Sequence, residues 1–225
     1  MKIHCKICTL KSQAAAKLSD EELDKLSLNC ANVKFHKGDA LIKQGTFSTN
    51  VAYLKTGLVK VHIAGPYHEQ IVRIVKAPGY LGLPTTFGDK INQYSVTALE
   101  ACDVCFIDLE TFRFLLKENP DFSYEIMIEL CKNELEVFYR CASRTQKQIR
   151  GKIADVLIEL SEHIFNSEKF VIPITQEEFG NLVDASRESI SRIMTEFEKD
   201  GIVKTSAKKI EILKRDTLIM VSENG

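Results

Sequence analysis

The amino-acid sequence predicts an α+β protein with an N-terminal β-roll, one long helix and a C-terminal pair of short helices followed by a β-hairpin. Three observations support this prediction. Short apolar runs alternate with turn residues between positions 33 and 109, which is typical of many short antiparallel strands. No proline or glycine occurs between positions 122 and 149, which favours one unbroken helix. Helix-start signals then recur at Thr175 and Ser186, and two apolar runs around a polar turn follow them.

The composition is that of an ordinary globular protein. Of its 225 residues, 44% are hydrophobic and 27% are charged. No apolar run approaches the roughly 20 residues of a membrane span, and the N-terminus lacks the apolar core of a signal peptide, so we expect a cytoplasmic protein without membrane contacts. The 7 cysteines favour free thiols or metal ligands over a disulfide framework. A net charge of −1 does not indicate nucleic-acid binding, so any such contact must depend on local charge and on a dimer's two half-sites.

Residues 1–32 are the expected N-terminal segment. Cys5 and Cys8 have the spacing C-x-x-C near its start. Ser19 and Glu22 have the spacing of a capping box, in which each side chain bonds the backbone N–H of the other residue. The segment is therefore expected to end in a short helix.

Residues 33–120 are the expected β-roll. The predicted strands are residues 33–35, 40–42, 51–54, 58–63, 70–75, 94–99 and 104–107. Glycines between these runs, such as Gly45 and Gly57, lie where a turn needs a positive φ or where strands approach closely. A short helix is expected from Asp108 to Asn119, and Pro120 interrupts it.

Residues 121–150 are the expected long helix. Its apolar residues form a heptad-like stripe of Met127, Leu130, Cys131, Val137, Phe138 and Cys141. A helix of about 28 residues is too long for so small a roll to cover, so a partner helix is the simplest cover. The alternative is a helix that packs wholly on its own domain. Gly151 is expected to act as a hinge before an amphipathic helix over residues 152–163.

Residues 151–225 are the expected C-terminal domain, and two short helices joined by a tight turn are predicted within it. Thr175 and Glu178 have the spacing of a capping box, Asp184 tolerates the left-handed turn, and Ser186 can cap the second helix. One face of this second helix is apolar, and the opposite face carries Arg187, Glu188, Ser191 and Arg192. Arginine can bond O6 and N7 of guanine together, and glutamate can accept from N4 of cytosine. The alternative is a helical hairpin with a solvated polar face.

A β-hairpin with a basic tip is predicted after these helices. Ile202-Val203 and Ile210–Leu213 flank a polar turn that carries Lys208 and Lys209. A hairpin that follows two such helices makes a winged helix-turn-helix, whose basic tip can contact the phosphate backbone.

Residues 175–202 resemble the DNA-binding segment of the cyclic-AMP receptor protein / fumarate-nitrate reductase regulator (CRP/FNR) superfamily. The shared motif is Glu178-Phe179-Gly180 followed by Ser186-Arg187-Glu188-Ser189-Ile190-Ser191-Arg192. The glycines of residues 37–82 resemble those of the superfamily's sensor, a cupin-like β-roll of the cyclic-nucleotide-binding type. The resemblance implies a homodimer whose long helices form the seam and whose second helices enter successive major grooves of double-stranded DNA at a near-palindromic site. RNA polymerase is a further expected partner if the protein activates transcription.

The resemblance also assigns roles to residues of the C-terminal domain. It implies base contacts by Arg187, Glu188 and Arg192, with Ser191 as a further contact. By position, the expected phosphate contacts are Thr175, Ser186, Lys204, Lys208 and Lys209.

The sensor departs from the superfamily's cyclic-AMP pattern. Cyclic-nucleotide members use a Gly-Glu pair on the ribose and an Arg-Ser pair on the phosphate, because a buried phosphodiester needs a paired cation. Here Leu83 follows Gly82 in place of the glutamate, and Tyr94 precedes Ser95 in place of the arginine. We therefore expect a signal other than cyclic AMP, and these four residues mark the expected effector pocket.

The cysteines resemble those of the superfamily's oxygen-sensing branch. Cys5 and Cys8 resemble the start of its iron–sulfur ligand cluster, and Cys105 resembles its distant ligand. The remaining N-terminal ligand is missing, because residues 9–17 contain no cysteine, and Cys102 is a candidate substitute. Three interpretations stay open: an iron–sulfur cluster or other metal at Cys5, Cys8 and Cys105 with a fourth ligand, a redox switch of Cys5 and Cys8, or structural cysteines with an unknown organic effector in the roll.

These observations predict a sequence-specific DNA-binding transcription regulator of the CRP/FNR type and not an enzyme. The sequence shows no Ser-His-Asp constellation, phosphate-binding loop or HExxH motif. The rival prediction is a free-standing ligand-binding protein, which would have no use for the capping box, the basic helix face and the wing together.

Overall fold

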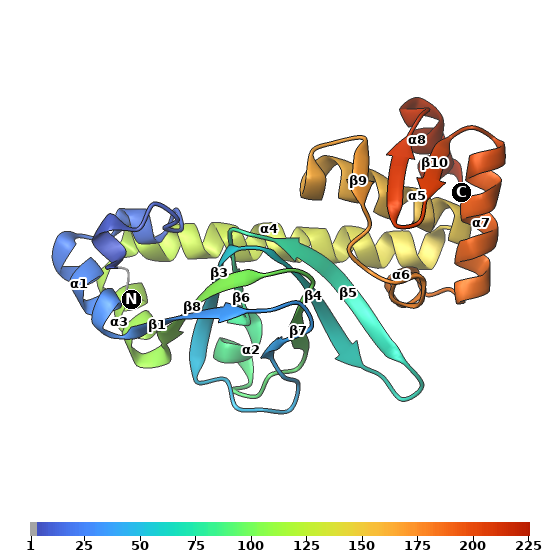
Figure 1. Ribbon diagram of the computed structural model, residues 1–225. Coiled ribbons are helices and arrows are strands. Elements are labelled where there is room, and N and C mark those ends of the chain that lie inside the picture. Colours follow the sequence, from blue (N-terminus) through green and yellow to red (C-terminus); the bar gives the residue numbers. More distant parts are fainter. Residues whose placement is uncertain (1–3) are drawn as a thin grey trace. The chain divides into compact units, whose positions relative to one another are not determined.

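The computed structural model describes residues 4–225 and confirms the α+β class (Figure 1). The first three residues of the predicted N-terminal segment lie outside the described residues. The chain folds as two compact units. The first comprises the chain up to Ala64 together with Arg73–Glu136, and the second comprises Gly65–Val72 together with Val137–Gly225. No helix within residues 4–225 combines the length and the apolar character that a membrane crossing requires.

The β-roll consists of four-stranded sheets with the strand orders β1-β8-β3-β6 and β2-β7-β4-β5 (Figure 1). The strands are β1 (Cys30–Phe35), β2 (Ala40–Ile42), β3 (Asn50–Thr56), β4 (Leu58–Ala64), β5 (Glu69–Lys76), β6 (Gly79–Leu81), β7 (Ser95–Ala98) and β8 (Cys102–Asp108). Each predicted strand is confirmed, with ends that differ by a few residues. The sequence did not predict β6, because a strand of 3 residues is too short to show alternation.

The central strands of the first sheet are β3 and β8. They pair antiparallel, with Ala52 opposite Phe106. Gly57 follows β3 with a φ of +102°, and a Cβ there would lie 2.6 Å from the carbonyl oxygen of Ala101. Only glycine combines this backbone conformation with so close an approach, as its place in the sequence predicted.

Several helices pack against the sheets of the roll. They are 3₁₀ turns at Cys5–Ile7 and Ala15–Lys17, α1 (Asp20–Leu28), α2 (Leu83–Gly88), α3 (Leu109–Glu118) and the start of α4 (Pro120–Gln146). α1 and α3 lie side by side (Figure 1). Phe112 of α3 is fully buried. Its ring centroid lies 5.8 Å from that of Tyr80 and 5.4 Å from that of Phe122. The capping box of Ser19 and Glu22 is confirmed at the start of α1.

α4 begins after the predicted break. Asn119, which precedes Pro120, is extended, and its Oδ1 accepts a hydrogen bond from the backbone N–H of Phe122 at 2.9 Å. This bond satisfies one of the N–H groups that a helix start leaves without a partner.

α4 belongs in part to each unit, because the division of the chain falls after Glu136, and few of its side chains are buried. Its buried residues are Phe122 and Ile126, and Leu130 packs against the same core. The predicted stripe is thus divided, because Leu130 belongs to the core whereas Met127, Val137 and Phe138 are exposed. A long helix with an exposed apolar face needs cover from elsewhere.

The second unit contains the remaining elements. They are α5 (Ile149–Glu159), a π-helical turn at Leu160–Phe165, β9 (Lys169–Val171), α6 (Gln176–Val183), α7 (Arg187–Lys199), β10 (Val203–Ser206), β11 (Lys209–Ile212) and α8 (Arg215–Asn224). The strands form a sheet of order β10-β11-β9. The sequence analysis did not predict α8.

The expectation of a hinge at Gly151 is wrong. α4 ends at Gln146, and the extended Gln148 is the N-cap of α5, so Gly151 lies inside that helix. Gly151 is buried, and a Cβ on it would lie 2.9 Å from the carbonyl carbon of Gly225. This glycine is required by close packing, and the break in the helix lies before it.

A methyl group at Gly180 is expected to destabilise the second unit. Gly180 lies in α6, and a Cβ on it would lie 2.4 Å from the backbone carbonyl oxygen of Ala185. A backbone atom cannot move aside as a flexible side chain can, so Gly180→Ala should lower the free energy of unfolding by about 1–3 kcal/mol. Thermal or urea unfolding measures this. Gly88→Ala in α2, where nothing lies within 4 Å of the added methyl, is the matched control and should be neutral. Equal stability of the two variants would contradict the packing described.

Candidate nucleic-acid interface

The turn between α6 and α7 is fixed by local hydrogen bonds. The Thr175 side chain accepts from the backbone N–H of Glu178 at 3.1 Å, and the Glu178 carboxylate accepts from that of Thr175 at 2.8 Å. Asp184 has a φ of +57°, in the left-handed region, as predicted. Ser186 Oγ then accepts from the backbone N–H of Ser189 at 3.2 Å and caps α7. The predicted caps and turn are thus all confirmed.

α7 buries one face and exposes the other. Ile190, Ile193 and Phe197 are buried, and the Arg150 guanidinium lies 4.9 Å above the Phe197 ring. The polar face is solvent-exposed and carries the predicted base-contacting side chains.

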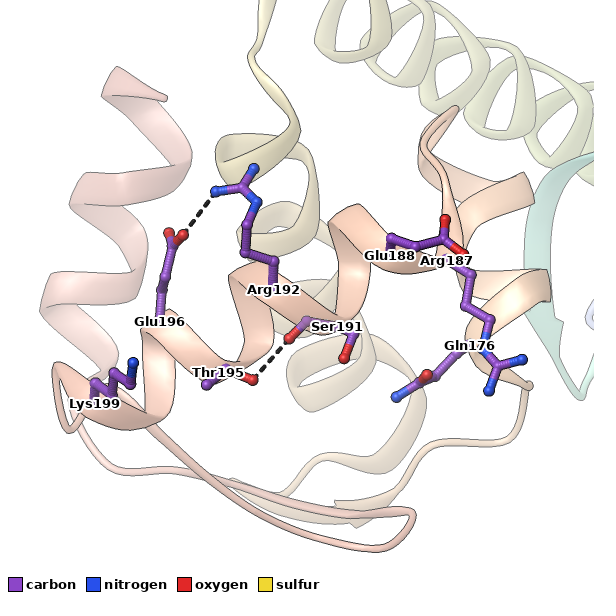
Figure 2. Close-up of a pocket in the computed structure, with 8 residues that line it drawn as sticks. All are labelled: Gln176, Arg187, Glu188, Ser191, Arg192, Thr195, Glu196 and Lys199. Carbon is purple, nitrogen blue, oxygen red and sulfur yellow. Dashed lines mark hydrogen bonds and ion pairs between the residues drawn. The ribbon is translucent and has the colours of Figure 1, made fainter.

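A shallow groove runs along this polar face (Figure 2). Its lining residues are Gln176, Arg187, Glu188, Ser191, Arg192, Thr195, Glu196 and Lys199. The structure therefore brings the four predicted base-contacting residues onto one surface. Sequence reasoning missed Gln176, Thr195, Glu196 and Lys199. The helical spacing from Arg192 would have indicated Thr195, Glu196 and Lys199.

Charged contacts orient the arginine of the middle turn. Arg192 Nη1 lies 2.7 Å from Glu196 Oε1, which Figure 2 shows as a dashed line, and Arg150 Nη1 lies 3.0 Å from Glu196 Oε2. Arg150 also lies 2.8 Å from Asp200. Because Glu196 bridges two guanidinium groups, it can hold Arg192 over the groove before any ligand arrives.

Glu188 lies at the N-terminal end of α7. A hydrogen bond from its own backbone N–H, with a further one from Ser186, lowers the pKa of its carboxyl group. The group is therefore an acceptor at neutral pH, as a contact to cytosine N4 requires.

The wing carries its lysines on the exposed side. β10 and β11 are joined at Ala207 and Lys208, and Ala207 has a φ of +55°. The turn is shorter than the predicted polar stretch, so Lys204 and Lys209 lie in the strands. Thr205 donates from its backbone and side chain to Glu198 Oε1 at 2.7 and 2.6 Å, which ties the wing to α7.

The expected effector residues lie beside α2. Gly82 has a φ of +81° and is the N-cap of α2, and Leu83 is 2% exposed and packs in the core. Burial raises the pKa of the Tyr94 hydroxyl, and Ser95 Oγ accepts from the backbone N–H of Gln44 at 3.0 Å. An apolar, buried Leu83 has no group with which to bond a ribose.

The thiols of Cys5, Cys30 and Cys105 meet at the end of the first sheet. Cys5 lies in a 3₁₀ turn, Cys30 begins β1 and Cys105 lies in β8. The sulfurs of Cys5 and Cys30 are 3.9 Å apart, and Cys30 also hydrogen-bonds Cys105. The Cys5 backbone N–H donates to Ser27 Oγ at 2.8 Å, which fixes the turn against α1.

These contacts polarise the thiols. The hydrogen bond from Cys30, helped by one from Ser27, lowers the pKa of Cys5 to about 6, although burial opposes this shift. The pKa of Cys30 is raised, because its hydrogen is shared with Cys105 and Cys5. These opposite shifts favour the thiolate at Cys5 and the protonated thiol at Cys30.

The predicted metal ligand set is not assembled. Within the described part of the chain, no group of three or more His, Cys, Asp or Glu side chains is arranged to hold a metal ion. The neighbour of both Cys5 and Cys105 is Cys30, which sequence reasoning did not consider, rather than Cys8. Cys102 is buried elsewhere, 3.5 Å from the carbonyl oxygen of Leu58, and is no substitute ligand. An iron–sulfur cluster needs four converging sulfurs, and the thiols that hydrogen-bond one another here are those of Cys5, Cys30 and Cys105.

Comparisons with known proteins agree with this architecture. Residues 32–119 match the cyclic nucleotide-binding domain family, and residues 151–221 match the Crp-like helix-turn-helix domain family. Together these matches take in both the β-roll and the groove of α7.

The chain belongs to the CRP/FNR family of transcription regulators.

Individual relatives from both branches of the CRP/FNR family span nearly the whole chain. The transcriptional activator protein FnrA of Stutzerimonas stutzeri is 27% identical over 93% of this chain and 88% of its own length. The cAMP-activated global transcriptional regulator CRP of Escherichia coli O157:H7 is 24% identical over 86% of this chain and 95% of its own. The structure of a crp/fnr family regulator from Eubacterium rectale has the same fold, with a TM-score of 0.78 at 18% identity, over 95% of this chain and 99% of that chain.

As a CRP/FNR family member, the protein is a DNA-binding transcription regulator rather than an enzyme or a free-standing ligand-binding protein. The groove of α7, with its exposed Arg187 and Arg192, lies within the residues that match the helix-turn-helix domain.

Proposed function

We propose that the protein is a cytoplasmic homodimer that regulates transcription from a near-palindromic site and responds to a signal other than cyclic AMP. One observation carries the DNA-binding part of this proposal. Arg187, Glu188, Ser191 and Arg192 share one exposed groove on the N-terminal half of α7. Side chains at that end of a second helix are those that reach base edges in the major groove.

The polar groups around this groove suit the DNA backbone. Thr175 and Ser186 lie at helix N-termini, where hydroxyl and N–H groups bind phosphates. Lys204, Lys208 and Lys209 of the wing are exposed and add positive charge to a chain whose net charge is −1. RNA polymerase is a further partner if the protein activates transcription.

The exposed stripe of α4 supports a dimer. Tyr124, Met127, Cys131, Phe138 and Cys141 fall at the positions of a heptad seam, with steps of 3, 4, 7 and 3 residues, and Glu134 occupies the seam position between Cys131 and Phe138. Tyr124, Met127 and Phe138 are 58%, 52% and 60% exposed. A second copy of α4 supplies a matching stripe, and a symmetric dimer places two α7 helices on half-sites about 34 Å apart.

The signal is proposed to act through the thiols and not through cyclic AMP. Leu83 and Tyr94 occupy the places of the family's ribose and phosphate contacts, whereas Cys5, Cys30 and Cys105 adjoin the core that holds the start of α4. Oxygen, nitric oxide or another oxidant is the proposed class of signal. A small organic effector within the β-roll is the alternative, with Gly82, Leu83, Tyr94 and Ser95 at its pocket.

Gel-shift titration of genomic fragments tests the DNA-binding proposal. The reduced protein should shift a small subset of fragments, and the double variant Arg187→Ala/Arg192→Ala should shift none selectively. Shifts of every fragment with equal affinity by both proteins would contradict the proposed role of the groove.

Lys208→Ala is expected to weaken binding to all DNA sequences alike. A phosphate contact carries no sequence information, and each one contributes about 0.9 to the slope of log K against log salt. A dimer loses two such contacts, so the slope should fall by about two. Lys37→Ala, which removes the same charge from an exposed turn of the roll, is the control and should leave the slope unchanged. A sequence-dependent loss in Lys208→Ala would contradict the phosphate assignment.

A further inference from the structure

Cys30 has a position that neither the proposed DNA contacts nor a metal site explains. Its sulfur lies 3.9 Å from that of Cys5, and both side chains pack against the core that also contains Phe122 and Ile126 of α4. Closing this gap to a covalent bond of about 2.05 Å requires a shift of less than 2 Å. Cys5 lies in a 3-residue 3₁₀ turn, which can make such a shift more easily than a strand inside a sheet.

The register of the sheet decides which thiols can join. Cys30 lies opposite Ile107, and Asn32 lies opposite Cys105, so Cys30 and Cys105 are diagonal neighbours on β1 and β8. Diagonal Cα atoms in an antiparallel pair are about 7–8 Å apart, which is beyond the range that a disulfide spans without backbone movement. Cys105 can therefore hydrogen-bond Cys30 but is not placed to bridge it. Cys5 is the partner whose approach is not limited by a strand register.

We propose that Cys5 and Cys30 form a modification site that hydrogen peroxide converts into a disulfide. The Cys5 thiolate attacks one peroxide oxygen, the O–O bond breaks, and hydroxide leaves and takes up a proton as water. The resulting Cys5 sulfenic acid is then attacked by the sulfur of Cys30, which loses its proton. The S–S bond forms as the S–O bond breaks, and a second water leaves, so two thiols lose two electrons to one peroxide. Cys5 is taken as the attacking sulfur because its short 3₁₀ turn can move towards an oxidant more easily than the strand that holds Cys30.

This inference deepens the proposed thiol signal, and only its effect on DNA binding rests on the proposed function. The bond would tie the N-terminal turn to β1 beside the first turns of α4, which is how oxidation could reach the helix of the proposed dimer.

Peptide mapping tests the disulfide without any use of DNA. Protein purified under reducing, oxygen-free conditions is treated with one equivalent of hydrogen peroxide, remaining thiols are alkylated, and trypsin is added. Trypsin cleaves after Lys6, so Cys5, Cys8 and Cys30 fall in separate peptides. The expected product is a Cys5–Cys30 linked peptide whose mass is two hydrogens below the sum of its parts.

Variants separate the pair from the other cysteines. Cys30→Ser should remove the linked peptide and leave Cys5 as a sulfenic acid that dimedone traps, whereas Cys8→Ser and Cys102→Ser should leave the link unchanged. Linkage of Cys5 to Cys8, linkage of Cys30 to Cys105, or no linkage would overturn the proposal. Stoichiometric iron or zinc in the reduced protein that is lost in Cys30→Ser would also overturn it. Gel shifts of the reduced protein then report on the DNA-binding proposal separately.

Discussion

Phe138→Glu is expected to convert the protein from dimers to monomers and to lower its affinity for a specific DNA site at least about 100-fold. Phe138 is 60% exposed and belongs to the apolar stripe in the C-terminal half of α4. In a parallel seam this position faces its own copy, so the variant would bury two unpaired carboxylates. Loss of the dimer removes the second half-site, whose contribution to affinity is about 10²- to 10⁴-fold. Sedimentation velocity measures the first effect and gel-shift titration the second.

Tyr139→Glu is the matched control for this prediction. Tyr139 is 74% exposed and directly follows Phe138, but it lies off the three-and-four spacing of the stripe. The Tyr139→Glu variant introduces the same charge into the same helix and should leave the dimer intact. A Phe138→Glu protein that remains dimeric, or a Tyr139→Glu protein that dissociates as readily, would show that the stripe is not the seam.

Arg192→Ala is expected to lower affinity for the specific site by about 1–3 kcal/mol, or roughly 5- to 150-fold, and to leave binding to random DNA nearly unchanged. Arg192 is exposed in the groove of α7 and is held by Glu196 at 2.7 Å. A bidentate contact to guanine discriminates between bases, whereas the ion pair that the variant loses is exposed and contributes little to folding. The unfolding midpoint should therefore stay close to that of the parent protein.

Lys199→Ala serves as the comparison for Arg192→Ala. Lys199 lines the far end of the same groove and is the last residue of α7 (Figure 2). The Lys199→Ala variant should lower the affinity for specific and random DNA by equal factors, as loss of a phosphate contact does. If Arg192→Ala also loses equal affinity for both kinds of DNA, Arg192 contacts phosphate and the base-reading assignment is wrong.

The helix-turn-helix was predictable from sequence because its determinants act over three or four residues. The capping box of Thr175 and Glu178, the left-handed Asp184 and the Ser186 cap each depend on hydrogen bonds within one turn. The same holds for the glycines of the roll, since a turn such as that at Gly57 is a local requirement. Such local determinants can be recognised in a single sequence.

Features that depend on distant segments were not predictable. The sequence does not show that Cys30 lies against Cys5 and Cys105, because strand pairing creates that contact. Gly151 was expected to be a hinge because a glycine after a long helix is a common break. Its actual role, close packing against Gly225, depends on a residue at the other end of the second unit's sequence. Tertiary packing overrides local preference at such positions, and the boundary between α4 and α5 was misplaced for the same reason.

Selection of bound sequences from a random double-stranded DNA library tests the central claim most directly. The reduced, dimeric protein is predicted to enrich a near-palindrome whose half-sites lie about one helical turn apart. Arg192→Ala should relax the preference at one symmetric pair of positions within it. Recovery of unenriched sequence, or of a single asymmetric site bound by one protomer, would contradict a homodimer that reads DNA through α7.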